Sequence, residues 1–462
     1  MKQAIPIFLI AATLTGCLVG PKTDKTKRET NKTYREQQSA QSTDSASMLK
    51  WTEVYQDPVL QSLVSTALKQ NYDMLTAMAK IDEAGAAAGY SKADLFPSLS
   101  YSAGASVLNL SNSQANELGI QQRDLYHGIG VVSWELDIWG KTRHATRSSK
   151  AQLLASIESR NAVTSSLVSQ VAMLYFKLRG LDERLTIARA TLDVRKEGTR
   201  IITLRFKGGE VPELDKFQAE TQESITAAMV PNIERDVRQT ENALSILLGN
   251  LPGTIDRGLE NREQKIVEIP AGIPSTLLSR RPDVKQAEQL WIAQNERIGV
   301  YQAARYPTIN LTGALGVASN DLSTLTSGGG IWNLAGGITG PIFAFNKNKR
   351  RVEIERAKTE QVRLNYEKTA LNAFAEVEDA LISVNTYSRE YAARARQVES
   401  ARGAAVLSAQ RYDSGYTSYL ELLDNERTLL NAQLEASATL QQQLQATVML
   451  YKALGGGWQP TN

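Results

Sequence analysis

The chain has 462 residues, of which 42% are hydrophobic and 22% charged, and its formal net charge is +3. This length allows roughly three ordinary domains, while so small a charge, with Lys and Arg spread among Asp and Glu, gives no argument for a nucleic-acid partner. Two histidines and one cysteine nearly exclude a zinc site built from several His and Cys ligands, so we expect no metal and no soluble cofactor.

The N-terminus has the pattern of a secretory signal over residues 1–16, with Lys2 before the apolar stretch Ile5–Leu14. The residues Leu14-Thr15-Gly16-Cys17 resemble the bacterial lipobox, in which the signal is removed and the cysteine carries lipid. The alternative is that Cys17 is an incidental thiol. Residue 18 is Leu rather than Asp, which in this class suggests sorting to the outer membrane. We therefore expect Cys17 to be acylated and to anchor the chain in the bacterial outer membrane.

The rest of the chain is organised as a tether and two halves. Residues 17–57 are predicted to be a lipidated N-terminus and polar tether, because 22–47 contain almost no large apolar residue. The halves, 58–256 and 257–462, match each other in register. Offsets of 210 and 206 residues respectively align Phe96-Pro97 with Tyr306-Pro307, and Leu248-Gly249 with Leu454-Gly455. We infer an internal duplication, each half running helix, two strands, long helix, helix, with a period too long for a solenoid.

The first half opens with a helix, for which Asp57 is the predicted N-cap and Pro58 the first residue. Four later segments alternate between apolar and polar residues and are predicted strands: 98–110, 125–138, 308–320 and 331–342. Each is long enough to cross a bilayer at a tilt, which takes about 9–11 residues. The opposite faces are predicted to be polar, and the apolar faces carry Leu99, Tyr101, Ala103, Ala105, Val107, Tyr126, Val132, Trp134, Leu136, Ile138, Ile309, Leu311, Leu315, Val317, Trp332, Leu334, Ile338 and Ile342.

Four strands per chain cannot close a membrane barrel by themselves. Single-chain bacterial barrels start at about eight strands, and an unpaired N–H in hydrocarbon costs several kcal/mol. A small soluble sheet with one buried face is the alternative, but Trp and Tyr on the apolar faces favour a membrane barrel. The barrel must then be shared, with eight strands from two chains or twelve from three.

Two long helices follow the strands. Lys141–Phe206 contains no Pro and would be roughly 100 Å long, and Asn346–Tyr412 corresponds to it in the second half. Helices of this length must project into the periplasm, because a bilayer core is only about 30 Å thick. A coiled-coil seam is predicted at Leu167, Val171, Leu174, Leu178, Leu181, Leu185, Ala188 and Leu192.

The long helices are followed by turns and returning helices. The turns Gly208-Gly209 and Ser414-Gly415 contain glycine, which adopts the left-handed conformation that ends a helix. Glu213–Leu248 and Thr417–Leu454 are predicted to return and pack against the long helices.

Over nearly all of its mature length the chain is similar to the outer-membrane factors of tripartite efflux pumps, the TolC-like and OprM-like channels. The resemblance is carried by the lipobox at Cys17, Trp134-Glu-Leu-Asp-Ile-Trp-Gly140, Arg280-Arg-Pro-Asp283, the paired turns and Ala453-Leu-Gly-Gly-Gly-Trp458. Such lipoproteins often have Pro-Asp-Tyr soon after the cysteine, where this chain departs with Pro21-Lys22-Thr23.

The resemblance implies a mixed α and β membrane protein. Its fold would be a homotrimer with a twelve-stranded outer-membrane β-barrel, four strands from each chain, continuous with a periplasmic coiled-coil barrel closed at its tip. It also implies a periplasmic adaptor and an inner-membrane RND-type pump as partners. The function implied is export of drugs or other small toxic compounds.

The resemblance further implies a gate at the periplasmic tip. In the family a Tyr near the second turn bonds to an Asp just after the first turn and holds the tip shut; these positions are Tyr412 and Asp215. A basic residue that reinforces this latch in some members falls at Thr417, so the chain departs from the family there. Two acidic positions that ring the constriction correspond to Glu421 and Asp424.

The acidic pair is open to two interpretations. Glu421 and Asp424 are three residues apart on a helix and share a face, and three-fold symmetry would turn each into a carboxylate ring that favours cations. Asp424 could instead pair with Arg427 on a solvated face. Leu420 is either an apolar constriction or an ordinary coiled-coil core leucine. The turns are expected to contact the adaptor through Lys207, Gly208, Gly209, Glu210, Val211, Asp413, Ser414, Gly415, Tyr416 and Thr417.

Two other functions remain open. A channel of the same fold in a type I protein secretion system is barely distinguishable by sequence, because specificity resides in the pump. A periplasmic coiled-coil scaffold without a pore is the second alternative. We do not expect an enzyme, because the sequence contains neither a Gly-x-Ser-x-Gly elbow nor a Gly-x-x-x-x-Gly-Lys-Ser/Thr loop.

Overall fold

The computed structural model describes residues 19–21, 35, 49–109, 122–265, 269, 274–327 and 330–459. The predicted signal and Cys17 lie outside these residues. The chain divides into two compact units. The first comprises Met1–Lys27, Lys80–Ile157 and Gln286–Glu367, and the second comprises Arg28–Ala79, Glu158–Lys285 and Lys368–Asn462.

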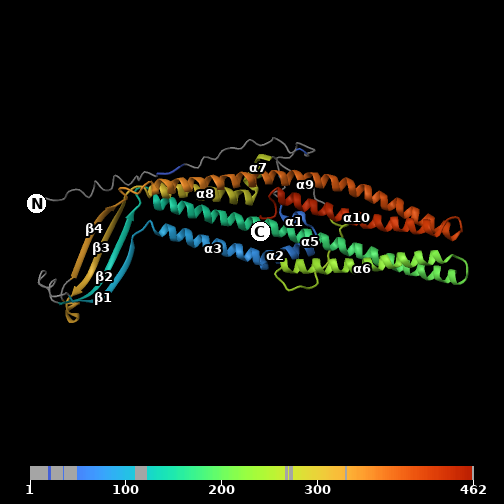
Figure 1. Cartoon of the computed structure of the whole chain (residues 1–462), viewed down its shortest axis with the longest axis horizontal. Coiled ribbons are helices and arrows are strands. Elements are labelled where there is room, and N and C mark those ends of the chain that lie inside the picture. Colours follow the sequence, from blue (N-terminus) through green and yellow to red (C-terminus); the bar gives the residue numbers. More distant parts are fainter. Residues whose placement is uncertain are drawn as a thin grey trace. The chain divides into compact units, whose positions relative to one another are not determined.

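The first unit contains one antiparallel sheet of four strands in the order β1-β2-β3-β4 (Figure 1). The strands are β1 (Ser98–Asn109), β2 (Gln122–Leu136), β3 (Thr308–Ser319) and β4 (Gly330–Thr339). All four predicted strands are present. Ile138 and Ile342, predicted to extend the apolar faces, lie beyond the ends of β2 and β4.

The register of the strands separates an apolar face from a more polar one. One row across the sheet runs through Tyr101, Gly130, Leu315 and Trp332. Tyr101, Leu315 and Trp332 are 90%, 70% and 78% exposed, so the predicted apolar face is uncovered in the single chain. An exposed apolar surface of this kind marks a contact with a membrane or another protein.

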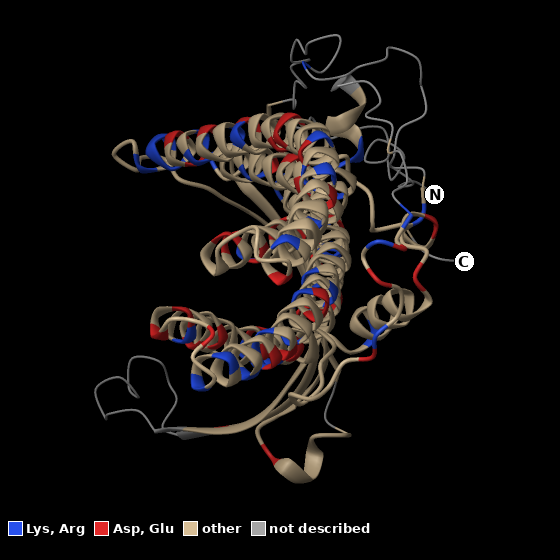
Figure 2. Cartoon of the chain, turned by 90° about the vertical axis from the view of Figure 1, so that its right-hand side faces the viewer, with Lys and Arg blue, Asp and Glu red and all other residues tan. Residues whose placement is uncertain are grey.

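The opposite face is less polar than predicted. One of its rows runs through Ser98, Ser133, Thr312 and Ala335, but the next includes Val131 and Ala314. The prediction of a polar face was therefore correct for the Ser and Thr positions and wrong for the middle of β2. Figure 2 shows that Lys, Arg, Asp and Glu are spread along the helices and are rare on the strands.

The second unit is helical. It contains α1 (Trp51–Val54), α2 (Pro58–Gln70), α6 (Glu213–Leu247), α7 (Pro274–Arg280) and α10 (Tyr419–Ala453). Parts of four longer helices belong to each unit: α3 (Tyr72–Ala93), α5 (Lys141–Lys207), α8 (Pro282–Ala303) and α9 (Lys347–Asp413). The predicted long and returning helices are confirmed to within two residues at each end. No helix in the described ranges is both long and apolar enough to span a membrane.

The predicted seam of α5 lies in the core of the second unit. Of its members, Leu167, Val171, Leu178, Leu181 and Ala188 are at most 4% exposed. Leu174 and Leu185 are partly buried against the same core, and Leu192 is half-buried.

Helix α1 was not predicted. It lies inside the range 17–57 that we assigned to the tether, yet Trp51 and Val54 are each only 5% exposed and belong to the core. The end of that range is therefore packed structure, because its few large apolar residues find partners on α5 and α10 that the local composition does not reveal.

Asp57 is confirmed as the N-cap of α2, since its Oδ1 accepts hydrogen bonds from Val59 N at 2.9 Å and Leu60 N at 3.4 Å. Its other oxygen, Oδ2, accepts from the Tyr175 hydroxyl at 2.7 Å and from Leu259 N at 2.9 Å. Asp57 is completely buried. One carboxylate thus joins α2, α5 and the segment that follows α6.

Two pairs of contacts occur at matching places in the two halves. Asn71 Nδ2 donates to Leu247 O at 3.0 Å, and Arg281 Nη1 donates to Ala453 O at 3.2 Å. The glycines that end the returning helices, at positions 249 and 455, have φ of +75° and +84° and lie against residues 70 and 280–281 respectively. In each half, these contacts fix the end of the returning helix, α6 or α10, to the residue just before an earlier helix, α3 or α8 respectively.

Candidate functional site at the helix turns

The two turns of the second unit join α5 to α6 and α9 to α10, and Figure 1 shows both at the end of the unit. Gly209 and Gly415 have φ of +75° and +77°, the left-handed conformation that glycine adopts without strain. Gly209 N donates to Phe206 O at 2.9 Å, and Gly415 N donates to Tyr412 O at 3.0 Å. These bonds satisfy carbonyls at the end of each long helix.

The predicted adaptor-contacting residues all lie in these turns or at their borders. Most are exposed, and Tyr416 is 79% exposed. Val211 and Thr417 are half-buried. The turns therefore present backbone and polar side chains to the surroundings, as a docking surface requires.

Tyr412 is in the last turn of α9. Its hydroxyl oxygen is buried and has no hydrogen-bond partner among the described residues. The ring lies 5.3 Å from that of Tyr419, and the Arg205 guanidinium is 5.8 Å from the ring centroid. Burial raises the pKa of Tyr412, Arg205 opposes this rise, and Asp215 and Asp413 add to it.

Asp215 is in the first turn of α6, where its N–H donates to Pro212 O at 3.1 Å. Burial raises the pKa of the Asp215 carboxyl group. The structure brings Asp215 close enough to influence the charge of Tyr412, but the described chain contains no direct hydrogen bond between the two side chains. Their assignment as a latch stays a prediction.

The three other predicted gate residues lie on the first turns of α10. Ser418 caps this helix and accepts a hydrogen bond from Glu421 N at 3.3 Å. Thr417 donates a hydrogen bond to the Glu421 carboxylate, so the position where the resemblance led us to look for a basic residue contacts this acid instead.

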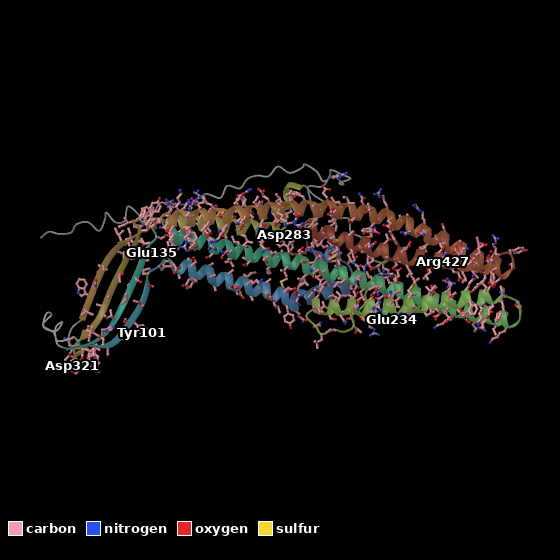
Figure 3. All side chains as sticks on the ribbon, in the orientation of Figure 1. Tyr101, Glu135, Glu234, Asp283, Asp321 and Arg427 are labelled. Atoms are coloured by element: carbon pink, nitrogen blue, oxygen red, sulfur yellow. The ribbon has the colours of Figure 1, made fainter. Side chains whose placement is uncertain are left out.

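Asp424 forms the ion pair with Arg427 that we considered as the alternative to a ring, and both side chains are 59% exposed. Figure 3 shows Arg427 on α10 toward its turn. Leu420 is 61% exposed, so it is not a core leucine of the single chain. It lines a cavity of about 310 Å³ together with Leu214 and Phe217.

Sequence reasoning missed two basic residues of this region, Arg205 and Arg195. Arg205 Nη2 lies 3.8 Å from Asp413 Oδ1, and the Arg205 guanidinium lies beside the Tyr412 ring. Arg205 therefore supplies the positive charge that Thr417 does not. Arg195 is only 5% exposed and pairs with Glu426 of α10. An arginine on the apolar stripe of a helix is the signal that could have identified Arg195.

Comparison with known proteins gives a consistent result. The sequence matches the family described as outer membrane efflux protein over residues 63–250 and 273–456. It is 33% identical over 413 residues to the "Probable efflux pump outer membrane protein TtgC" of Pseudomonas putida, covering 88% of this chain and 85% of that protein. It is 32% identical over 410 residues to the "Probable outer membrane lipoprotein SilC" of Salmonella typhimurium, covering 88% of each chain.

Among solved structures, the outer-membrane channel OprN superposes with a TM-score of 0.88 at 28% identity, covering 96% of this chain and 100% of OprN. The likeness thus extends over the strands, the long helices and both turns.

Proposed function

The chain belongs to the outer membrane efflux protein family, and on that premise we propose that three copies form one gated channel that carries drugs or other small toxic compounds to the exterior. Its location is the outer membrane, and its role is transport rather than catalysis. Its relatives are outer-membrane components of efflux pumps, which supports a periplasmic adaptor and an inner-membrane RND-type pump as the partners.

The exposed apolar face of the sheet is the observation that carries this proposal. In the described chain β1 and β4 each pair with one strand only, which leaves one edge of each open. Open edges and an apolar face are stable in lipid only when neighbouring copies pair the edges. Three copies of the 4-stranded sheet would give a closed barrel of twelve strands.

The helices also support a multimeric assembly. Several large apolar side chains of α5, α6 and α9 are more than half exposed in the single chain, among them Val194, Leu204, Ile225, Val406 and Leu407. Neighbouring copies would cover them and complete a helical tunnel.

The duplication of residues 58–256 and 257–462 is part of the proposal. The matching contacts of Asn71 with Leu247 and of Arg281 with Ala453 support it. The offset of 210 aligns Asn71 with Arg281, and the offset of 206 aligns Leu247 with Ala453.

We also propose that Cys17 carries the lipid anchor. Val19, two residues later, donates its N–H to Trp139 O at 3.4 Å, and Trp139 follows the end of β2. This contact supports the proposal, because it joins Val19 to the residues that follow β2.

The test is the size and conductance of the full chain purified in detergent. We expect a trimer that forms ion-conducting pores in planar bilayers. A non-conducting monomer that leaves the membrane without detergent once its lipid is removed would support the coiled-coil scaffold instead. Drug susceptibility of a deletion strain, complemented with the gene, separates small-molecule efflux from protein secretion.

Replacing Leu315 with Arg is expected to prevent assembly in the membrane. Leu315 is 70% exposed on the apolar face, and Arg facing lipid near the middle of a strand costs about 2–4 kcal/mol in each chain. The matched control is Ala314→Arg, which places the same charge on the opposite face. Heat-resistant trimer on gels measures the effect; equal trimer yields would contradict the orientation of the sheet.

Charge reversal at the turns, with Lys207→Glu combined with Asp413→Lys, is expected to abolish efflux without reducing trimer yield. Both residues are exposed at the turns, so their loss leaves the core intact while it inverts the docking surface. Lys177→Glu, an exposed position far from the turn on α5, is the control. If pumping survives the reversal, the adaptor docks elsewhere.

A further inference from the structure

The two helical hairpins of the second unit, α5–α6 and α9–α10, meet along α5 and α10. Away from the turns, polar bonds join these helices: Arg184 Nη2 donates to Gln441 Oε1 at 2.8 Å, and Ser437 Oγ donates to Glu183 Oε2 at 2.6 Å. Next to the turns, an apolar cluster joins the two hairpins through Ile202 of α5, Ala219 of α6, and Tyr419 and Leu423 of α10.

Between these two contact zones an ion pair joins α5 to α10. Arg195 Nη1 of α5 is 2.7 Å from Glu426 Oε2 of α10. Arg195 is 5% exposed and the Glu426 side chain 29%. The pair therefore connects one hairpin to the other where most of the charge of both groups is removed from water.

The ion pair borders two hollows between the helices. Two cavities of about 470 and 510 Å³ are both lined by Val194, Arg195 and Glu426. The first also touches Tyr419 and Leu422, and the second is otherwise mostly apolar. Because both hollows are lined by Arg195 and Glu426, the charge of this pair influences how closely α5 and α10 approach.

The buried carboxylate is only partly compensated. Burial raises the pKa of Glu426, and the attraction of Arg195 lowers it by less. Desolvation of a buried ion pair can exceed the attraction between its members. A group whose pKa is raised in one arrangement stabilises that arrangement when it is protonated, and this stabilisation is lost as the pH rises through the raised pKa. Acid should therefore favour the arrangement in which Glu426 is buried.

We propose that Arg195 and Glu426 form a second gating contact, which sets the separation of the two hairpins of one chain and makes closure of the tunnel sensitive to acid. This inference rests on the proposed channel function. In the closed arrangement, Arg195 offsets the free-energy cost of burying the ionised Glu426 carboxylate. Protonation of Glu426 removes that cost, so that the closed arrangement no longer depends on Arg195.

The other charged groups that line the cavities are few. On α5 they are Asp193 and Glu197, both exposed, and Glu197 pairs with Arg200. On α10 the other titratable group is Tyr419. Burial raises its pKa to about 12, so the hydroxyl stays neutral. The lining residues from α6 and α9, including Ala219 and Ala405, are uncharged. Asp215 near the turns also has a raised pKa, so its contribution needs a control.

The decisive variant is Arg195→Met, examined by single-channel recording at about pH 7.5 and about pH 4.5. At the higher pH it leaves an ionised carboxylate buried without a partner, so we expect the open-time fraction to rise on the order of tenfold. At the lower pH Glu426 is protonated and the open-time fraction should return toward that of the unmodified channel. Arg200→Met, the same change in an exposed pair of the same helix, should have no effect at either pH.

Two further variants separate charge from packing. Glu426→Gln mimics the protonated acid, so it should remain closed at both pH values while the unmodified channel closes further in acid; Asp215 is present in both, which controls for its titration. Arg195→Met with Glu426→Met removes both charges and should also remain closed. If Arg195→Met yields no trimer, the comparison of Glu426→Gln with the unmodified channel decides.

The inference is overturned if the Arg195→Met channel conducts like the unmodified channel while the variant that lacks the Tyr412 hydroxyl and the Asp215 carboxylate is open. It is also overturned if Arg195→Met opens the channel equally at both pH values. If no variant at either contact changes conductance, the proposed gate at the turns fails as well.

Discussion

Single-channel conductance should rise severalfold, with the trimer intact, when Tyr412→Phe is combined with Asp215→Ala. The Tyr412 hydroxyl is buried without a partner in the described chain, and buried hydroxyls are nearly always hydrogen-bonded. Asp215, on the facing hairpin of the same chain, is an acidic group that acts on Tyr412, and we propose that its carboxylate is the partner of this hydroxyl when the tip is closed. A hydrogen bond to a charged group contributes about 1.5–3 kcal/mol, and a trimer would contain three.

Phenylalanine keeps the ring, so the packing on Tyr419 at 5.3 Å is retained and only the hydroxyl is removed. The matched control is Tyr416→Phe with Glu213→Ala, which makes the same changes at exposed positions of the two turns. Planar-bilayer recording measures both variants. Unchanged conductance in the first variant, or an equal rise in the control, would contradict the assignment of Tyr412 and Asp215.

The features that could be predicted from the sequence are those determined by local periodicity. Alternation along β1 placed Leu99 and Tyr101 on the same face, and the observed register agrees. The lengths of α5 and α9 followed from the absence of Pro, and their ends followed from Gly209 and Gly415, whose positive φ is confirmed. Each of these depends on residues that are close together in the chain.

The features that could not be predicted depend on contacts between distant residues. Asp57 was recognised as a helix cap from the Pro that follows it, but nothing local indicates that Tyr175 and Leu259 also donate to its carboxylate. The burial of Trp51 and the pairing of Arg195 with Glu426 are of the same kind. Resemblance to a family predicted roles for Tyr412 and Asp215 but not for Arg205, because the basic residue that it implied was expected at Thr417.

Replacing Asp57 with Ala should cause the largest loss of stability of any single substitution considered. The carboxylate is completely buried, and burial followed by the hydrogen bond to Asp57 raises the pKa of the Tyr175 hydroxyl. Alanine would leave that hydroxyl and Leu259 N without their acceptor. Each unsatisfied buried donor costs about 1–3 kcal/mol, and the lost N-cap costs about 1 kcal/mol more, so we expect a loss of roughly 3–7 kcal/mol per chain.

Thermal unfolding of the detergent-solubilised protein, followed by circular dichroism, measures this loss. Asp321→Ala is the matched control, because Asp321 is also an N-cap, accepting from Ser323 N at 2.9 Å, but is exposed. Asp57→Asn should fall between the two, since it keeps the shape and one acceptor oxygen but loses the charge. The short helix α2 would be affected first, because both its cap and its connection to Tyr175 depend on this residue. Equal midpoints for Asp57→Ala and Asp321→Ala would mean that water replaces the carboxylate, and that apolar contacts of α2 with the core, among them those of Leu60 and Val64, hold the helix in place.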